Sequence, residues 1–465
     1  MSVAVAAPHP AAVEAARAVV AVGGNAFDAA LAAAGALAVV YPHQCSVGGD
    51  LVAMVRPAHS GVRTVLSIGA AARDARVESM PLRGPQTVTV PGVVAGWAAV
   101  RSLGARLPLS ELLAPAIRFA ADGVDKSKGL RTAISHGLEV VRADPGLAAT
   151  MLGPTLVQPA LAATLTEIGH DWRTFYSGHL NQRLVAGLQS LGSALSTADF
   201  AAHTAEVVAP LRRTVGNLVW HAAPPPVQGA TFLAVAGSPS LLPDCRRAQA
   251  ARNALLGDPR GGPISIDGLL LRTREALDPA PEPPKPTGDT VAITAVDDEG
   301  NAVTIIQSVF ESFGAGLLDP DTGILLHNRG TSFSLDPSHP AHFGPGLRPP
   351  HTLCPTIALG PDAVIALGAQ GGRAQPWILA QLAPDVLTAP DPAALVTRPR
   401  WILRGNDLIL EPGTPPPPDT DDLTVTTTAG PHDDAGHAQL ARLRAGSLDA
   451  GSDPRADGTA TVIAT

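Results

Sequence analysis

Thr290 is the residue of this chain whose setting best suits chemistry. It follows Gly288 and Asp289, and the preceding arm, residues 278–286, carries five prolines. Proline cannot donate to a sheet ladder or sit inside a helix, so the arm is predicted to be an exposed, extended tether. If the chain is cut between Asp289 and Thr290, the freed α-amine, with a pKa of about 7.7, can act as base for the threonine hydroxyl. The pattern therefore favours an N-terminal threonine nucleophile, although a threonine that opens a strand can also be purely structural.

A β-hairpin is predicted directly after the arm. Two β-branched runs, residues 290–296 and 302–308, flank the turn-forming residues 297–301, which is the signature of paired antiparallel strands. If residues 298–300 form a three-residue loop, the register places Ser308 opposite Thr290. A loop one residue longer would place Val309 there instead.

Gly371 and Gly372 are the best candidates for an oxyanion site. They follow a predicted strand, residues 363–367, and the backbone N–H groups of a Gly-Gly turn can bind a developing oxyanion. Each such donor lowers the barrier by about 3 kcal/mol. An ordinary turn is the alternative interpretation.

Other chemistries find little support. The sequence has no H-E-x-x-H, C-x-x-C, Walker or G-x-S-x-G pattern. His432 and His437 lie in a polar stretch without a third ligand, and Gly314-Ala315-Gly316 lacks the last glycine of a dinucleotide site. We therefore expect neither a metal nor an organic cofactor.

Composition narrows the possible partners. The formal net charge is -8 with a pI near 5.9, and no block of Lys or Arg interrupts the sequence, which argues against binding to nucleic acid or to an anionic membrane surface. The longest apolar run, residues 29–41, is too short to span a bilayer. The three dispersed cysteines, Cys45, Cys245 and Cys354, and the absence of an export signal favour a cytoplasmic protein.

Periodicity and turn residues predict an α+β protein that folds as one intertwined body. Helices are predicted over residues 11–22, 26–40, 93–103, 243–256 and 374–387, with a mostly helical region over 109–191. Outside the hairpin, strands are predicted over 51–56, 62–68, 87–90, 207–212, 217–222, 323–326, 356–359 and 363–367, and the last 75 or so residues as loops and edge strands.

A series of short motifs, in order along the whole chain, resembles the γ-glutamyltranspeptidase family. The motifs are His9-Pro10, residues 23–30 (GGNAFDAA), Pro42-His43, 48–50 (GGD), 90–92 (VPG), 95–97 (AGW), 114–117 (APAI), 257–259 (GDP), 288–290 (GDT), 297–301 (DDEGN), 313–316 (FGAG), 322–325 (TGIL), Arg348-Pro349, Pro355-Thr356, Gly371-Gly372 and 452–455 (SDPR).

The resemblance implies an N-terminal-nucleophile hydrolase with a four-layer αββα sandwich. Such a protein is made as a proenzyme and cut into two segments, here 1–289 and 290–465, which associate as a heterodimer and act on a small amide substrate. Carried over position by position, Thr290 is the nucleophile, Ser308 supports its amine, and Gly371 and Gly372 form the oxyanion site.

Substrate recognition departs from the glutamyl-specific members. The family arginine for the substrate α-carboxylate aligns with Gly69, so we expect Arg73, four residues on, to bind the substrate. The acidic residue for the α-amine aligns with Ser332, which is expected to line the same site. Two further contacts are replaced by Phe310 and Arg329, and a serine pair by His351 and Thr352.

A site with the cation Arg329 but no acidic residue at position 332 suits an acidic acyl group that lacks an α-amine, such as a glutaryl or oxamate-like amide. Three alternatives remain: Arg329 and Arg348 are structural, the protein is a glutathione hydrolase with a rebuilt pocket, or it is an unprocessed relative without activity.

Overall fold

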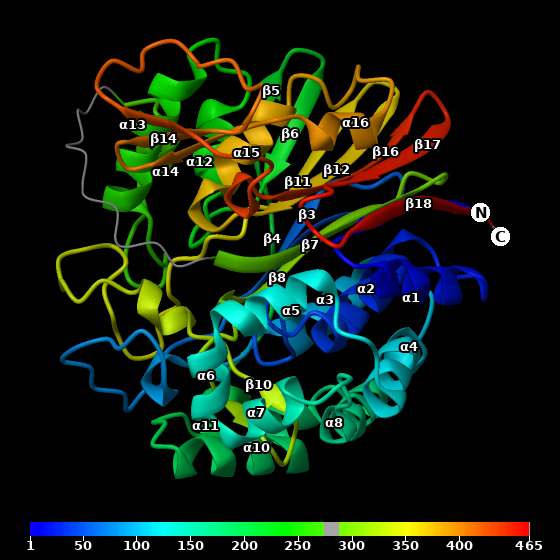
Figure 1. Ribbon diagram of the computed structural model, residues 1–465, viewed down its shortest axis with the longest axis vertical. Helices are drawn as coiled ribbons and strands as arrows, with labels where there is room; N and C mark the ends of the chain where they lie inside the picture. The colour runs from blue at the N-terminus through cyan, green and yellow to red at the C-terminus, as the bar shows by residue number, and fades with distance from the viewer. Residues whose placement is uncertain (274–287, 465) are drawn as a thin grey trace.

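A seven-stranded sheet forms the centre of the molecule (Figure 1). The structure is a computed structural model and describes residues 1–273 and 288–464. The predicted arm, residues 278–286, lies outside the described residues. In spatial order the strands are β18 (Thr459–Ala464), β1 (Ser2–Ala7), β7 (Gly288–Asp297), β8 (Ala302–Glu311), β2 (Asp50–Arg56), β3 (Arg63–Ser67) and β4 (Glu206–Val208).

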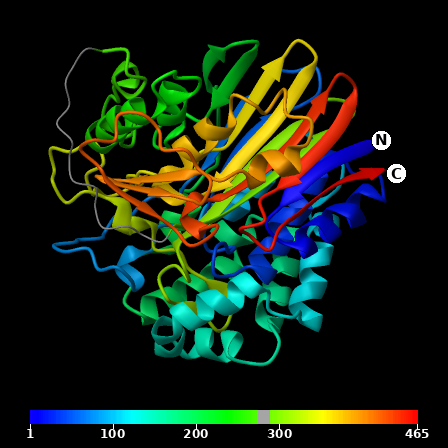
Figure 2. The same cartoon turned by 45° about the horizontal axis from the view of Figure 1, so that its top comes forward.

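A second, six-stranded sheet packs face to face on the first (Figure 2). A shared apolar cluster joins them, in which Ala292 and Ile306 of the first sheet meet Ile357 and Ala366 of the second. Its strands in spatial order are β17 (Ser447–Ser452), β16 (His437–Arg444), β12 (Ala363–Gln370), β11 (Thr356–Gly360), β6 (Leu218–Ala222) and β5 (Leu211–Val215).

Helices cover the outer face of each sheet, which confirms the α+β class. On the first sheet α2 (Ala26–Val40) packs against β7 and β8, and α3 (Val93–Gly104) against β2 and β3; on the second, α12 (Gly229–Val235) packs against β6 and α15 (Gln375–Leu382) against β12. The remaining α-helices are α1 (Pro10–Val20), α4 (Leu109–Asp122), α5 (Lys128–His136), α6 (Leu138–Ala143), α7 (Pro145–Met151), α8 (Pro159–His170), α9 (Thr174–Ser177), α10 (His179–Ser190), α11 (Thr197–Ala201), α13 (Leu241–Leu255), α14 (Ile266–Leu269) and α16 (Pro392–Thr397).

Helix α2 shows how sequence sets this arrangement. Asn25 accepts hydrogen bonds from the backbone N–H groups of Phe27 and Asp28, and the Asp28 carboxylate accepts the Asn25 N–H in return. This capping box fixes where the helix begins. Every residue of α2 is buried, because the helix lies between the first sheet and α4.

Three of the predicted strand regions differ from the structure. Residues 207–212 do not form one strand, because the strand is interrupted near Pro210. The chain passes there from β4 in the first sheet to β5 in the second. Residues 87–90 form no strand: Thr87 ends a 3-10 turn, Pro85–Thr87, and residues 88–90 belong to no helix or strand. The C-terminal region was predicted as loops and edge strands. β17 and β18 do lie at sheet edges, but β16 lies inside the second sheet with buried residues over most of its length.

Both predicted segments contribute to the first sheet. Strand β8 and most of β7, which begins two residues before Thr290, come after the Asp289–Thr290 bond and lie between β1 and β2, which come before it. The two ends of the chain also pair, β1 with β18 (Figure 1). Among the described residues, no helix is long and apolar enough to cross a membrane. The three cysteines are buried free thiols.

Candidate active site

The hairpin register is as predicted, with Thr290 directly opposite Ser308. The Thr290 hydroxyl donates a hydrogen bond to Ser308 Oγ at 3.0 Å. Both side chains are buried. The nucleophile predicted from sequence thus has a hydroxyl partner on the neighbouring strand.

A β-bulge lies at the bond predicted to be cut. The pairing passes from Asp289 opposite Phe310 to Thr290 opposite Ser308, which leaves Val309 as an extra residue on β8. Phe310 adopts a φ of 78°, and its N–H donates to Ser308 Oγ at 2.8 Å. The bulge thus lies directly beside the Thr290–Ser308 pair, at the end of the regular ladder.

Asp50 extends the same row of side chains. It pairs with Ser308 across β2 and β8, and residues directly opposite each other in a sheet point to the same face. Thr290, Ser308 and Asp50 therefore form one row facing the second sheet. Sequence reasoning did not assign Asp50 a role, although it ends the GGD motif at 48–50.

The Asp50 carboxylate is fully buried, accepts hydrogen bonds and lies beside two histidines. Its Oδ1 accepts the Gly69 N–H at 3.1 Å, and its Oδ2 lies 3.2 Å from His351 Nε2 and 3.4 Å from His327 Nδ1. Burial works in the opposite direction, but the two histidines hold the pKa of Asp50 below its usual range. His327 was also missed by sequence reasoning, and no motif around it points to this contact.

Arg329 is a fully buried cation beside the row. Its guanidinium carbon lies 3.8 Å from the centre of the Phe310 ring, and Nη2 lies 3.4 Å from Ser308 Oγ. Among the described residues no carboxylate lies within ion-pair distance, and Nε has no hydrogen-bond partner. Burial lowers the pKa of Arg329 to about 9, so the group is still charged at neutral pH.

Thr352 contacts the second terminal nitrogen of the Arg329 guanidinium, and His351 precedes Thr352 in the chain. Thr352 Oγ1 accepts a hydrogen bond from Arg329 Nη1 at 3.3 Å. Burial, together with the positive charge of Arg329, lowers the pKa of His351 to about 3. The ring is therefore neutral at neutral pH and donates through Nε2 to Asp50, because a carboxylate only accepts.

Gly371 and Gly372 follow β12, where a 3-10 turn (Gly372–Ala374) contacts β7. Both have positive φ, 149° and 53°, and a Cβ on Gly371 would lie 2.3 Å from Ile378 Cδ1. Gln228 Nε2 donates to the carbonyls of Thr352, at 2.5 Å, and of Gly372, at 3.0 Å. This buried amide, which sequence reasoning missed, ties the glycine turn to the Arg329 side of the site.

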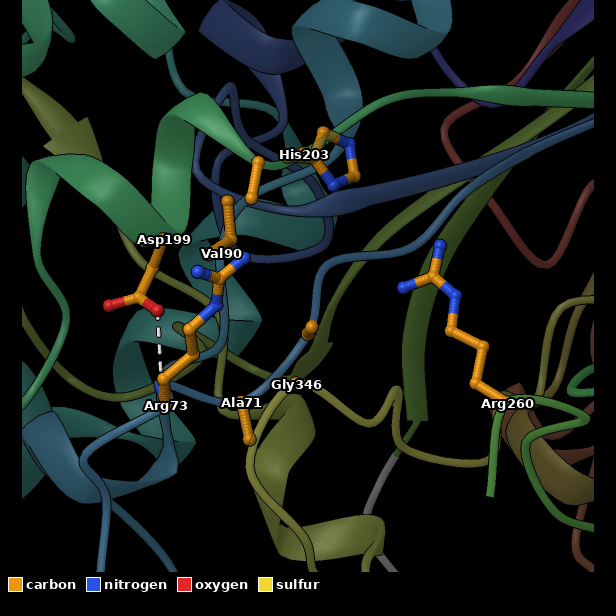
Figure 3. A pocket seen from close by; sticks show the side chains of 9 residues that line it. Ala71, Arg73, Val90, Asp199, His203, Arg260 and Gly346 are labelled. Atoms are coloured by element: carbon orange, nitrogen blue, oxygen red, sulfur yellow. Dashed lines mark hydrogen bonds between the residues drawn. The ribbon is translucent and has the colours of Figure 1, made fainter. Parts of the chain in front are cut away.

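Two other predicted substrate-binding residues lie differently. Ser332 is half-buried at the end of the 3-10 turn Arg329–Ser332. Arg73 is exposed and lines a separate pocket of about 110 Å³ with Arg260 and His203 (Figure 3). Thr290, Ser308 and Arg329 are not part of that lining. At Gly69, a Cβ would lie 1.4 Å from the Val90 carbonyl oxygen, so this position cannot carry an arginine.

Arg348 has a structural environment. Its guanidinium binds Asp258, with a 2.8 Å contact between Nη2 and Oδ1, and Glu206, with a 3.0 Å contact. These groups raise the pKa of Arg348 despite its burial. Its charge is satisfied within the protein. No group of three or more His, Cys, Asp or Glu among the described residues could hold a metal ion.

Comparisons with known proteins identify the family. The sequence model of the family "Gamma-glutamyltranspeptidase" matches residues 12–238 and 245–463. The chain is 37% identical to the oxamate amidohydrolase proenzyme of Klebsiella pneumoniae, over 85% of this chain and 84% of that one. It is 33% identical to the glutathione hydrolase-like YwrD proenzyme of Bacillus subtilis, with the same shares covered.

A solved structure has the same fold. Cephalosporin acylase from Bacillus halodurans superposes with a TM-score of 0.88 at 27% identity, over 99% of this chain and 95% of that one. The sequence match across both segments and the agreement of the fold lead to one conclusion. The chain belongs to the γ-glutamyltranspeptidase family.

Proposed function

We propose that this amide hydrolase of the γ-glutamyltranspeptidase family cuts itself before Thr290 and then cleaves amides whose acyl group carries a carboxylate but no α-amine. The observation that carries the proposal is Arg329, a buried cation without a carboxylate partner among the described residues, beside Ser308. A buried charge is costly unless it is paired. An anionic substrate would supply the missing partner.

Self-cleavage would use the row of hydroxyls. Thr290 Oγ1 attacks the carbonyl carbon of Asp289, and the Asp289–Thr290 C–N bond breaks to leave an ester on Oγ1 and a free α-amine on Thr290. Water then hydrolyses the ester and leaves a carboxylate on Asp289. The segments 1–289 and 290–465 would remain together as a heterodimer, because their strands alternate in the first sheet. In this proposal the two sheets and their helices form the four-layer αββα sandwich of N-terminal-nucleophile hydrolases.

Turnover would use the same threonine. Its amine accepts the Oγ1 proton as the oxygen attacks the substrate carbonyl, and then passes that proton to the leaving nitrogen. Ser308 holds the threonine in line, and the N–H groups of Gly371 and Gly372 stabilise the oxyanion. Water, or an acceptor amine, attacks the acyl ester and restores the threonine.

The acyl group would be held by the residues that replace the family contacts. A zwitterionic glutamyl group needs an anion for its ammonium, and Ser332 supplies none. Phe310 offers an aromatic face that already carries Arg329. A glutaryl- or oxamate-like amide fits these groups, and one relative bears the name oxamate amidohydrolase.

The first test is the state of the purified full-length protein. Intact mass and a denaturing gel should show two pieces, residues 1–289 and 290–465, and Thr290→Ala should remain one chain. Ser308→Ala is expected to cleave more slowly. A parent protein that stays uncut but hydrolyses amides at the same rate with alanine at position 290 would refute the proposal.

The second test is substrate charge. The cleaved enzyme should hydrolyse oxamate or a glutaryl amide with a higher kcat/KM than the matching γ-glutamyl amide. A preference for the γ-glutamyl amide would favour a glutathione hydrolase with a rebuilt pocket, and inactivity toward all of them would favour a non-catalytic relative.

A further inference from the structure

The residues around Arg329 form a closed ring on the acyl side of the nucleophile. Ser308 contacts Arg329 Nη2 at 3.4 Å, and Arg329 Nη1 contacts Thr352 Oγ1 at 3.3 Å. The preceding residue, His351, contacts Asp50 at 3.2 Å, and Asp50 is the ladder partner of Ser308. The members of this ring, here called the acyl ring, are all buried.

His351 is held in place from two sides. Its backbone N–H donates to the Pro226 carbonyl at 2.8 Å, and its Nε2 donates to the buried Asp50 carboxylate. Its other nitrogen, Nδ1, is buried and has no partner among the described residues. The imidazole of His351 is therefore a rigid part of the acyl ring, because moving it would break a charge-assisted hydrogen bond.

The distance from nucleophile to cation is short. Thr290 Oγ1 lies 3.0 Å from Ser308 Oγ, which lies 3.4 Å from Arg329 Nη2, and these two lengths together are the upper limit for the distance from Oγ1 to Nη2. An acyl carbon bonded to Oγ1 and a carboxylate about 2.8 Å from the guanidinium must both fit within that span. A carboxylate bonded directly to the acyl carbon fits it. A glutaryl chain, with its three methylenes, is too long for that span and would need room beyond it, where the ring is closed by Thr352 on Arg329 Nη1 and by His351 on Asp50.

We propose that His351 is a specificity-determining residue that closes the acyl ring and limits the acyl group to the two-carbon oxalyl type. This inference rests on the proposed function, since it takes Arg329 as the carboxylate-binding group. It goes further by choosing between the oxamate-like and glutaryl-like substrates.

The test is whether the preference for acyl chain length changes when the His351 side chain is replaced by a smaller one. The series oxamate, malonamate, succinamate and glutaramate releases ammonia in every case, so one assay gives kcat/KM for each. The parent should prefer oxamate, with kcat/KM falling at each added methylene. His351→Ser and His351→Asn should raise the ratio of glutaramate to oxamate by 10-fold or more.

Matched variants distinguish the steric effect of the His351 side chain from a general loss of activity. His351→Gln keeps a similar volume and an N–H donor for Asp50, so it should retain the parent ratio. His221→Ser removes a half-buried histidine from β6, outside the acyl ring, and should also leave the ratio unchanged. His351→Asn keeps a donor for Asp50 in a smaller side chain, so it covers the case in which His351→Ser does not fold.

Two outcomes would overturn the inference in distinguishable ways. If the cleaved parent hydrolyses acidic amides but prefers glutaramate, or if the small variants keep the parent ratio, His351 does not set the length and the proposed function still stands. If the cleaved parent hydrolyses no acidic amide of the series, the proposed function fails and the inference fails with it.

Discussion

Two buried arginines in this molecule have opposite surroundings. Arg348 lies against the carboxylates of Asp258 and Glu206, and these raise its pKa. Arg329 is equally buried, has no carboxylate within ion-pair distance among the described residues, and has its pKa lowered by burial. The guanidinium charge is thus paired with carboxylates at Arg348 and has no carboxylate partner among the described residues at Arg329.

The difference distinguishes a structural charge from a functional one. Removing one partner of a buried ion pair leaves the other uncompensated, so an arginine such as Arg348 is expected to stabilise its surroundings. A buried cation without a partner costs stability, and a protein tolerates that cost where a ligand will provide the counter-charge. Replacing each arginine by methionine, which removes the charge and keeps much of the volume, compares the two directly.

The largest effect is expected at Arg348. Arg348→Met should lower the free energy of unfolding by about 3–5 kcal/mol, because it leaves the Asp258 carboxylate buried without its cation. Urea denaturation of the cleaved protein measures this value. A loss below 1 kcal/mol would show that the Asp258 contact contributes little.

At Arg329 the same substitution should affect activity and leave the fold stable. Arg329→Met should reduce kcat/KM for oxamate by about 30-fold or more, since a buried charged contact to substrate contributes 2 kcal/mol or more. Its free energy of unfolding should be unchanged or higher by about 1 kcal/mol. A destabilised but fully active Arg329→Met would reverse the comparison.

The sequence predicted the parts of the site that depend on local pattern. The register of Thr290 and Ser308 follows from a three-residue turn between two β-branched runs, and turn residues and strand alternation are local signals. The burial of α2 on all sides follows likewise from its uniformly apolar sequence.

The parts that require contacts between distant segments were not predictable. Asp50 meets His351 across 301 positions of the chain, and no pattern around either residue encodes that contact. The bulge at Val309 depends on hydrogen bonds to Gln44 and Asn328, outside the hairpin. β16 falls in the region predicted as loops and edge strands but lies between β12 and β17. Arg73 was placed with the substrate by alignment although it lines another pocket.

Dicarboxylate binding offers a further comparison of the two arginines. Oxalate should stabilise the cleaved parent, by about 2.7 kcal/mol at a hundred times its dissociation constant, because it supplies the counter-charge for Arg329. Arg329→Met should lose this stabilisation, whereas Arg348→Met should keep it from a lower starting point. Thermal unfolding at constant ionic strength measures both. Equal stabilisation of all three proteins would mean that oxalate binds elsewhere.

The smallest expected effect is on the pH profile. The Thr290 amine must be unprotonated to act as base, so kcat/KM should rise with pH through its pKa. An α-amine has an ordinary pKa of about 7.7, and the positive charge of Arg329 nearby disfavours its protonated form, so the acid limb should lie below that value. His351, with a pKa of about 3, should add no limb near neutrality, and Asp50 is already ionised there.

Arg329→Met removes the repulsion and should move the acid limb upward by up to about one unit, measured as kcat/KM of the residual reaction from pH 5 to 9. A limb that stays in place would mean that the guanidinium and the amine do not interact, and that Arg329 serves the carboxylate alone.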